Sequence, residues 1–355
     1  MGVEPERGYC DGRLLKRRER ALDSRGDRAP AVRRCVTIAR LDSSAKIAGT
    51  ATRRFAREQA DRLLGRLAFQ IGRAIKSRNA EAIHDLRVTI RRFAQALRAF
   101  KPCFHGKALR KIRRELKQIM AVAGEVRNHD IALKLVAKSK KAQGTVLQSK
   151  IQGGRREAER SLITLLKRWL ERKSSLKWRS ALDASAAEAQ DNFCKVPLAQ
   201  TARQMLPGMA EDFFEQGDEA ASTEAEPREL HRFRISSKRF RYTLELFTPL
   251  HGATLNSKLD AIRRGQALLG DINDFETVRN ILNQYEGTEA ATAWLKKRQR
   301  KRLLEFREYW DATFSPKAER RSWIDFLKGQ EPRTQRKPAA RTAPESRRQS
   351  STAVA

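Results

Sequence analysis

The sequence predicts an all-α protein made of two four-helix bundles related by a pseudo-twofold axis. Three observations lead to this prediction. Two segments that begin at His84 and His231 repeat each other, apolar residues recur at helical spacing along most of the chain, and no stretch shows a convincing strand pattern. An internal repeat indicates that the architecture is doubled.

Each repeated segment places a histidine before a row of cations. Arg87 aligns with Arg234, Arg91 aligns with Lys238, and a proline follows each copy at the same offset. The apolar residues recur at intervals of three and four, which puts them on one helix face, and the cations fall on roughly the opposite face. Each helix is therefore expected to pack by one side and to present cations on the other.

Four helices are expected in the first half. They cover about residues 55–75, the histidine helix up to Pro102, residues 109–123 and residues 154–170, and residues 173–190 are interpreted as a connecting segment. The third of these helices carries four cations in one narrow polar sector: Arg110, Arg113, Arg114 and Lys117.

The second half repeats this order. Helices are expected over residues 198–214, from His231 to about residue 247, over 255–285 and over 292–310, and a short apolar piece at 323–327 follows. Gly124 and Gly270 begin another pair of matching segments, each at the same distance after its histidine helix. The polar residues after these glycines are interpreted as groups that form hydrogen bonds inside the bundles or orient the arginines.

The charge of the chain points to an anionic partner. The net charge is +33, from 75 Lys and Arg against 42 Asp and Glu. Self-repulsion of this size destabilises a compact state unless a polyanion neutralises it, so the candidates are nucleic acid, an acidic membrane surface and a polymeric phosphate.

Composition also suggests the compartment and the domain limits. The four cysteines lack metal or redox spacing, no apolar run reaches membrane-spanning length, and no secretory signal begins the chain, which together predict a cytoplasmic protein. Residues 1–52 and 329–355 are basic and are expected to be mostly disordered. The helical domain is expected over residues 53–328, with halves at about 53–190 and 195–328.

The segments around both histidines resemble the CHAD family, the conserved histidine α-helical domain. The resemblance lies in residues 81–92, in residues 229–245, and in residues 268–274, which are similar to the Leu-Gly-x-x-Asn-Asp segment of that family. It implies two four-helix bundles that face each other across a basic central channel, inorganic polyphosphate as the ligand, and an association with polyphosphate granules. The signature of the CYTH triphosphatase often fused to such domains is not found, so the chain resembles a stand-alone member.

A linear polyphosphate has no base edges to be recognised, so it requires many cations along a groove. Arginine pairs bidentately with phosphate oxygens, and lysine adds a compact charge. The candidate residues of the first half are His84, Arg87, Arg91, Arg98, Arg110, Arg113, Arg114 and Lys117. Those of the second half are His231, Arg234, Lys238, Arg239, Arg241 and Lys258.

The two histidines allow three interpretations. They could donate to phosphate, orient a neighbouring arginine, or only begin their helices. Neighbouring cations should disfavour the imidazolium form, and a bound polyanion should favour it.

A metal-dependent phosphohydrolase is one alternative function. His84-Asp85 and His129-Asp130 are pairs of residue types that can ligate metals. The equivalent positions of the second half read His-Arg and Phe-Glu, and dense arginine repels a metal ion. We therefore expect no enzyme, no catalytic residue, no metal and no cofactor.

Nonspecific nucleic-acid binding is the other alternative, because basic chains often bind DNA or RNA. Aromatic residues do not alternate with the cations, and Trp169 and Trp310 are spaced as core residues rather than as stacking platforms. Polyphosphate binding is therefore the preferred prediction.

Overall fold

The computed structural model describes residues 47–104, 106–139, 145–188 and 192–329. The disorder expected for residues 1–46 and 330–355 falls outside these ranges. Within them, the structure is all-α and contains no strand, only an isolated bridge between Ala51 and Pro197. The predicted fold class is thus confirmed, whereas the pseudo-twofold relation between the halves stays a prediction.

Five helices make up the first half: α2 (Thr52–Ser77), α3 (Ala80–Ala99), α4 (Gly106–Lys138), α5 (Thr145–Glu171) and α6 (Ser174–Glu188). The histidine helix α3 begins where the side chain of Asn79 accepts a hydrogen bond of 2.8 Å from the amide of Ala82, which satisfies one of the donors exposed at a helix start. Pro102 follows its end, within a short 3₁₀ turn (Lys101–Cys103).

The second half has the same order of long helices: α7 (Leu198–Ala221), α8 (Pro227–Leu246), α10 (Thr254–Leu282), α11 (Glu289–Thr313) and α12 (Lys317–Lys328). The single-turn helix α9 (Thr248–His251) separates α8 from α10. Glu226 and Glu229 form a capping box at the start of α8, and Pro227 occupies its first turn, where a missing amide proton costs nothing.

Two predictions about the elements were wrong. Residues 173–190 are not a simple connection, because most of them form α6, which packs against α2 and buries Trp178 and Leu182. The apolar piece at residues 323–327 is part of α12, which packs against α7. Each half therefore has a fifth helix. Helix α4 also continues well past its predicted end at residue 123, because small residues such as Ala132 carry its buried face onward.

The apolar faces of the repeated helices form the core, as predicted. Leu86, Ile90, Phe93 and Leu97 of α3 are buried, and so are Phe233, Phe240 and Leu244 of α8. Because burying these large side chains contributes about 2 kcal/mol each, the faces turned away from the core are the ones left for the cations.

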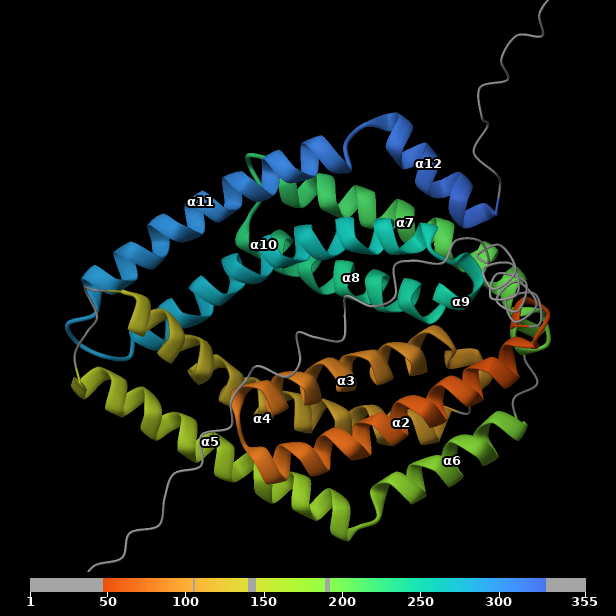
Figure 1. The fold of residues 1–355 in the computed structure, drawn as a ribbon, viewed down its shortest axis with the longest axis horizontal. Coiled ribbons are helices and arrows are strands. Elements are labelled where there is room, and N and C mark those ends of the chain that lie inside the picture. Colours follow the sequence, from red (N-terminus) through yellow and green to blue (C-terminus); the bar gives the residue numbers. More distant parts are fainter. Residues whose placement is uncertain (1–46, 105, 140–144, 189–191, 330–355) are drawn as a thin grey trace, which may run out of the picture. The chain divides into compact units, whose positions relative to one another are not determined.

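Among the contacts between the two halves are the pairs α3 with α8 and α4 with α10, visible in Figure 1. At the first, the rings of Phe100 and Phe247 lie 5.9 Å apart. At the second, Val136 of α4 and Phe275 of α10 belong to a separate small hydrophobic cluster. Cations from α3, α4 and α8 lie close to one another between these contacts. None of the helices in the described ranges is both long and apolar enough to cross a membrane.

Candidate functional site: a cationic groove between α3, α4 and α8

Two adjoining cavities open between α3, α4 and α8. One of about 720 Å³ is lined from all three helices, and one of about 260 Å³ lies between α3 and α8. They share the side chains of Arg91, Arg98 and Arg239, so we treat them as one cationic groove. The predicted site residues that line this groove are Arg91, Arg98, Arg113, Arg114, Lys117, His231, Arg234, Lys238 and Arg239.

Cations from several helices lie close together in the inner part of the groove. Burial, together with the charges of Arg234 and Arg91, lowers the pKa of Lys238 to about 6. Burial also lowers the pKa of Arg98, with Arg239 and Arg113 adding to the effect. These shifts show that cations from different helices are close enough to repel one another.

Arg87 lies at the inner end of this cluster. Its Nη1 donates to the carbonyl oxygen of Met120 at 3.3 Å, which ties α3 to α4. Burial lowers its pKa to about 10, with further contributions from Arg91, Arg127 and Arg234. Gly124 makes this position possible, because a Cβ there would lie 2.9 Å from Nη1 of Arg87.

Sequence reasoning did not assign Arg127 and Asp274 to the site. Burial raises the pKa of Asp274, although Arg234, Arg127 and Lys238 act to lower it. Asp274 is thus a carboxylate within reach of the inner cations. Both residues lie in the matching segments that begin at Gly124 and Gly270, and that repeat was the available signal. The interpretation that polar residues of these segments orient the arginines agrees with the position of Asp274.

The two histidines are placed differently. His231 lines the groove, whereas His84 is an exposed residue that does not. Partial desolvation of its imidazole still lowers the pKa of His84, and the charge of Arg127 makes the next largest contribution. Neighbouring cations therefore lower the pKa of His84, as expected, but they lower it less than desolvation does.

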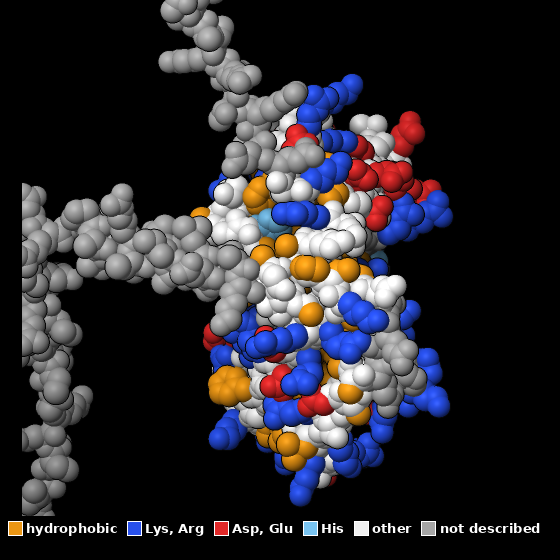
Figure 2. Space-filling model, turned by 90° about the vertical axis from the view of Figure 1, so that its right-hand side faces the viewer, with side chains coloured by type: hydrophobic (Ala, Val, Ile, Leu, Met, Phe, Trp, Pro, Cys, Tyr) orange, Lys and Arg blue, Asp and Glu red, His pale blue; other side chains and the backbone are white. Residues whose placement is uncertain are grey.

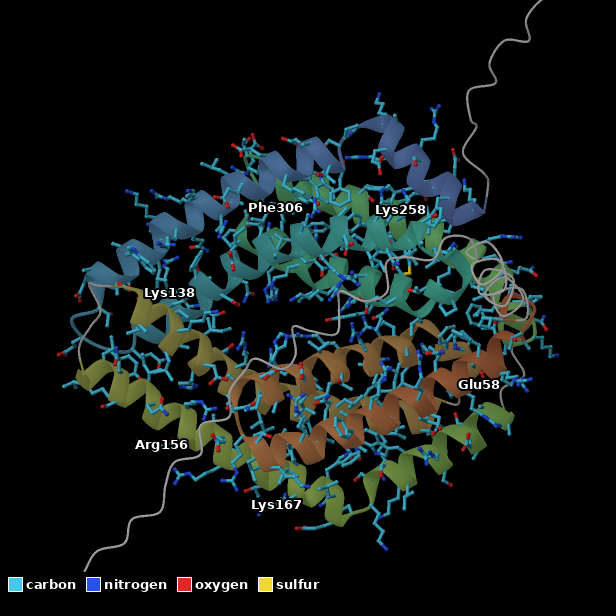
Figure 3. All side chains as sticks on the ribbon, viewed as in Figure 1. Glu58, Lys138, Arg156, Lys167, Lys258 and Phe306 are labelled. Atoms are coloured by element: carbon cyan, nitrogen blue, oxygen red, sulfur yellow. The ribbon has the colours of Figure 1, made fainter. Side chains whose placement is uncertain are left out.

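Besides His84 and Arg87, three more predicted residues do not line the groove. Arg110 is exposed near the start of α4 and lines neither cavity. Arg241 pairs with Glu245 at 3.1 Å and lies over the ring of Tyr242. Lys258 faces α12 instead, with Nζ 4.5 Å from the ring centroid of Trp323 (Figure 3). These contacts hold Arg241 and Lys258 away from the groove.

The proposed metal pairs are occupied by arginine. Asp85 accepts a hydrogen bond from Arg73 at 2.6 Å, and Asp130 accepts one from Arg155 at 2.7 Å. His129 packs against Gly154, where a Cβ would lie 2.6 Å from Nε2. No group of three metal-ligating side chains occurs in the part of the chain that the structure describes.

Positive charge is not confined to the groove. Figure 2 shows Lys and Arg side chains spread over one face of the molecule, with one group of Asp and Glu at its upper right and a few more among the cations below. Exposed cations of this kind are well solvated and contribute little individually. What distinguishes the groove is that its cations come from three helices and that some of them, such as Arg91, Arg234 and Lys238, are half-buried.

Comparisons with known proteins identify the fold and the family. The structure is similar to the crystal structure of the CHAD domain from the plant Ricinus communis, with a TM-score of 0.59 and 19% identity over 79% of this chain and 92% of that chain. It is also similar to PptA from Streptomyces chartreusis, with a TM-score of 0.52 and 16% identity over 75% and 100% of the two chains. No curated protein matches this sequence. The family description "CHAD domain" matches residues 58–283, which is more than half of the sequence. The chain therefore belongs to the CHAD domain family.

Proposed function

We propose that the cationic groove binds inorganic polyphosphate. The observation that carries the proposal is the convergence of cations from α3, α4 and α8 on one groove, with Arg91, Arg234 and Lys238 half-buried among them. The CHAD domain family is associated with polyphosphate binding, and membership of this family supports the same ligand.

The charge state of the groove favours a ligand with many closely spaced negative charges. Lys238, with a pKa of about 6, is mostly uncharged at pH 7 because the neighbouring arginines and burial disfavour its ammonium form. A bound phosphate chain would remove that penalty and would accept bidentate hydrogen bonds from the arginines. Binding would therefore strengthen interactions that are suppressed in the free protein.

Nucleic acid is less well suited to this groove. Single-stranded nucleic acids gain much of their affinity by stacking bases on aromatic side chains. The aromatic residue that lines the described groove is Tyr242, which is only 4% exposed and is covered by Arg241. A nucleic acid would then be held by its phosphates alone, without contacts for its bases.

We also propose a binding role without catalysis. The groove is lined by cations, amides and apolar groups, and no carboxylate lines its described part. A metal-dependent phosphohydrolase would need carboxylate ligands beside His231, the single histidine that lines the described groove. An association with polyphosphate granules would follow from the ligand itself.

A charge-matched pair of variants tests the proposal. Replacing Arg91 and Lys238 with Gln should weaken binding of long-chain polyphosphate by at least about tenfold, because hydrogen bonds to charged groups contribute about 1.5–3 kcal/mol. The control is Arg156→Gln with Lys167→Gln, which removes one arginine and one lysine from exposed positions on α5 (Figure 3). Fluorescence anisotropy at physiological salt measures both.

Equal weakening in the two double variants would show that the groove is not the binding site. Competition with duplex DNA distinguishes polyphosphate binding from nucleic-acid binding. If DNA displaces long-chain polyphosphate at physiological salt, nucleic-acid binding becomes the conclusion.

A further inference from the structure

A separate cavity adjoins the groove between α8, α10 and α11. It has a volume of about 240 Å³ and shares the side chains of His231 and Arg234 with the groove. We call it the side cavity. Its apolar lining residues are Ala225, Pro227, Leu230, Leu269, Ile272 and Leu303. Lys296 and Arg300 also line it, but a phosphate chain would lose hydration against the apolar walls.

The carboxylate in the wall of the side cavity is already neutralised. Arg279 donates to Glu276 at 2.7 Å and to the amide oxygen of Gln299 at 3.0 Å, and the amide nitrogen of Gln299 donates to Glu276 at 3.1 Å. This closed network leaves no uncompensated negative charge to repel an anionic ligand. Asn273 adds a further amide to the wall.

Two donors at the side cavity lack partners. The Nε atoms of Arg234 and Arg279 are buried and form no hydrogen bond within the described part of the chain. Buried donors are nearly always satisfied in folded proteins, so unpaired ones beside a cavity indicate a ligand or ordered water. Arg234 is one of the two residues that also line the groove, which places one unpaired donor where the two spaces meet.

We infer that the side cavity and the groove together bind a nucleoside polyphosphate, with the nucleoside in the side cavity and the phosphates directed past Arg234 into the groove. The inference rests on the proposed function, because the groove supplies the phosphate site. The apolar walls suit the faces of a base, and the amide groups suit its polar edge. The volume lies just below the range of typical small-molecule sites, which fits one nucleoside.

The matched ligands ATP and tripolyphosphate test this arrangement, because they carry similar phosphate chains and differ in the nucleoside. Titration calorimetry on the full chain in EDTA should show ATP binding about tenfold more tightly, since burying the base removes apolar surface from water. ATP that binds no more tightly than tripolyphosphate would overturn the inference.

Two neighbouring leucines on α11 provide a variant and its control. Leu303 lines the side cavity, whereas Leu304 is 57% exposed. Leu303→Trp should fill the cavity and abolish the preference for ATP, with tripolyphosphate and long-chain polyphosphate binding as before. Leu304→Trp should leave the preference intact. An unchanged preference in Leu303→Trp would contradict the inference.

A second filling variant covers the case in which Leu303→Trp fails to fold. Ala225 lines the cavity from the turn before α8, so Ala225→Phe should have the same effect, with folding checked by circular dichroism. If neither tripolyphosphate nor long-chain polyphosphate binds, the proposed function fails and the inference fails with it. If both bind and ATP is not preferred, only the inference fails.

Discussion

Gln95 of α3 donates a hydrogen bond of 2.8 Å from its amide nitrogen to the hydroxyl of Thr243 on α8. Both side chains are buried, and the Thr243 hydroxyl in turn donates to the carbonyl oxygen of Arg239 at 2.9 Å. A buried donor that loses its partner costs more than the bond itself contributes. The pair therefore fixes how the two histidine helices face each other, and with it the spacing of the cations in the groove.

Removing one member of this pair should destabilise the protein. Thr243→Val leaves the amide of Gln95 without its acceptor, which should lower the free energy of unfolding by about 1–3 kcal/mol. Chemical denaturation measures this change. Adding Gln95→Leu should recover part of the loss, because both polar groups are then absent. Strictly additive losses would show that the two side chains do not interact.

Binding of polyphosphate should take up protons. The free protein holds the pKa of Lys238 at about 6, through burial and the charges of Arg234 and Arg91, and Asp274 offsets this only in part. A bound polyanion raises that pKa, so between the free and bound values the complex carries more protons than the free protein. Affinity should therefore fall as the pH rises above about 6.

Calorimetry in buffers of different ionisation enthalpy measures the proton uptake directly. At pH 7.5 it should approach one proton for each site, since Lys238 changes from mostly neutral to charged. Lys238→Met should remove most of the uptake. Uptake that persists in this variant would assign the proton to another group.

Salt dependence should separate the cations that line the groove from those that do not. Arg98→Gln should reduce the slope of log affinity against log salt by about 0.7–0.9, because one phosphate contact is lost. Lys258→Gln should leave the slope unchanged, since Lys258 lies over Trp323 and 3.8 Å from Glu319. Equal changes in the two variants would indicate diffuse attraction to the whole surface.

Gly217 on α7 should tolerate no side chain. A Cβ there would lie 1.9 Å from the indole of Trp310, whose Nε1 donates to Asp218 at 2.9 Å. Gly217→Ala should therefore displace the indole and lower the free energy of unfolding by about 3 kcal/mol or more. Gly208 lies on the same helix with open space around it, so Gly208→Ala should stabilise slightly through helix propensity. Thermal denaturation compares the two variants, and similar melting temperatures would contradict the prediction.

Local patterns in the sequence were sufficient for the fold class and for the faces of the repeated helices. The spacing of Phe93 and Phe240 within their apolar stripes predicts which sides are buried, because a helix brings every third and fourth residue together. Arg91 and Lys238 therefore had to lie on the sides of the two helices that face away from the core. The helical character of residues 174–188 was missed, because the buried stripe of α6 is short and becomes favourable only against α2.

The composition of the groove depended on partners that lie far apart in the chain. Lys258 was predicted as a groove residue, yet Trp323 of α12 engages it. The pKa of Lys238 likewise follows from burial and from charges on α3 and α10. Helical periodicity determines the direction of a side chain from its own helix. Which other helix it meets, and therefore its charge state and its availability to a ligand, is decided only when the two halves pack together.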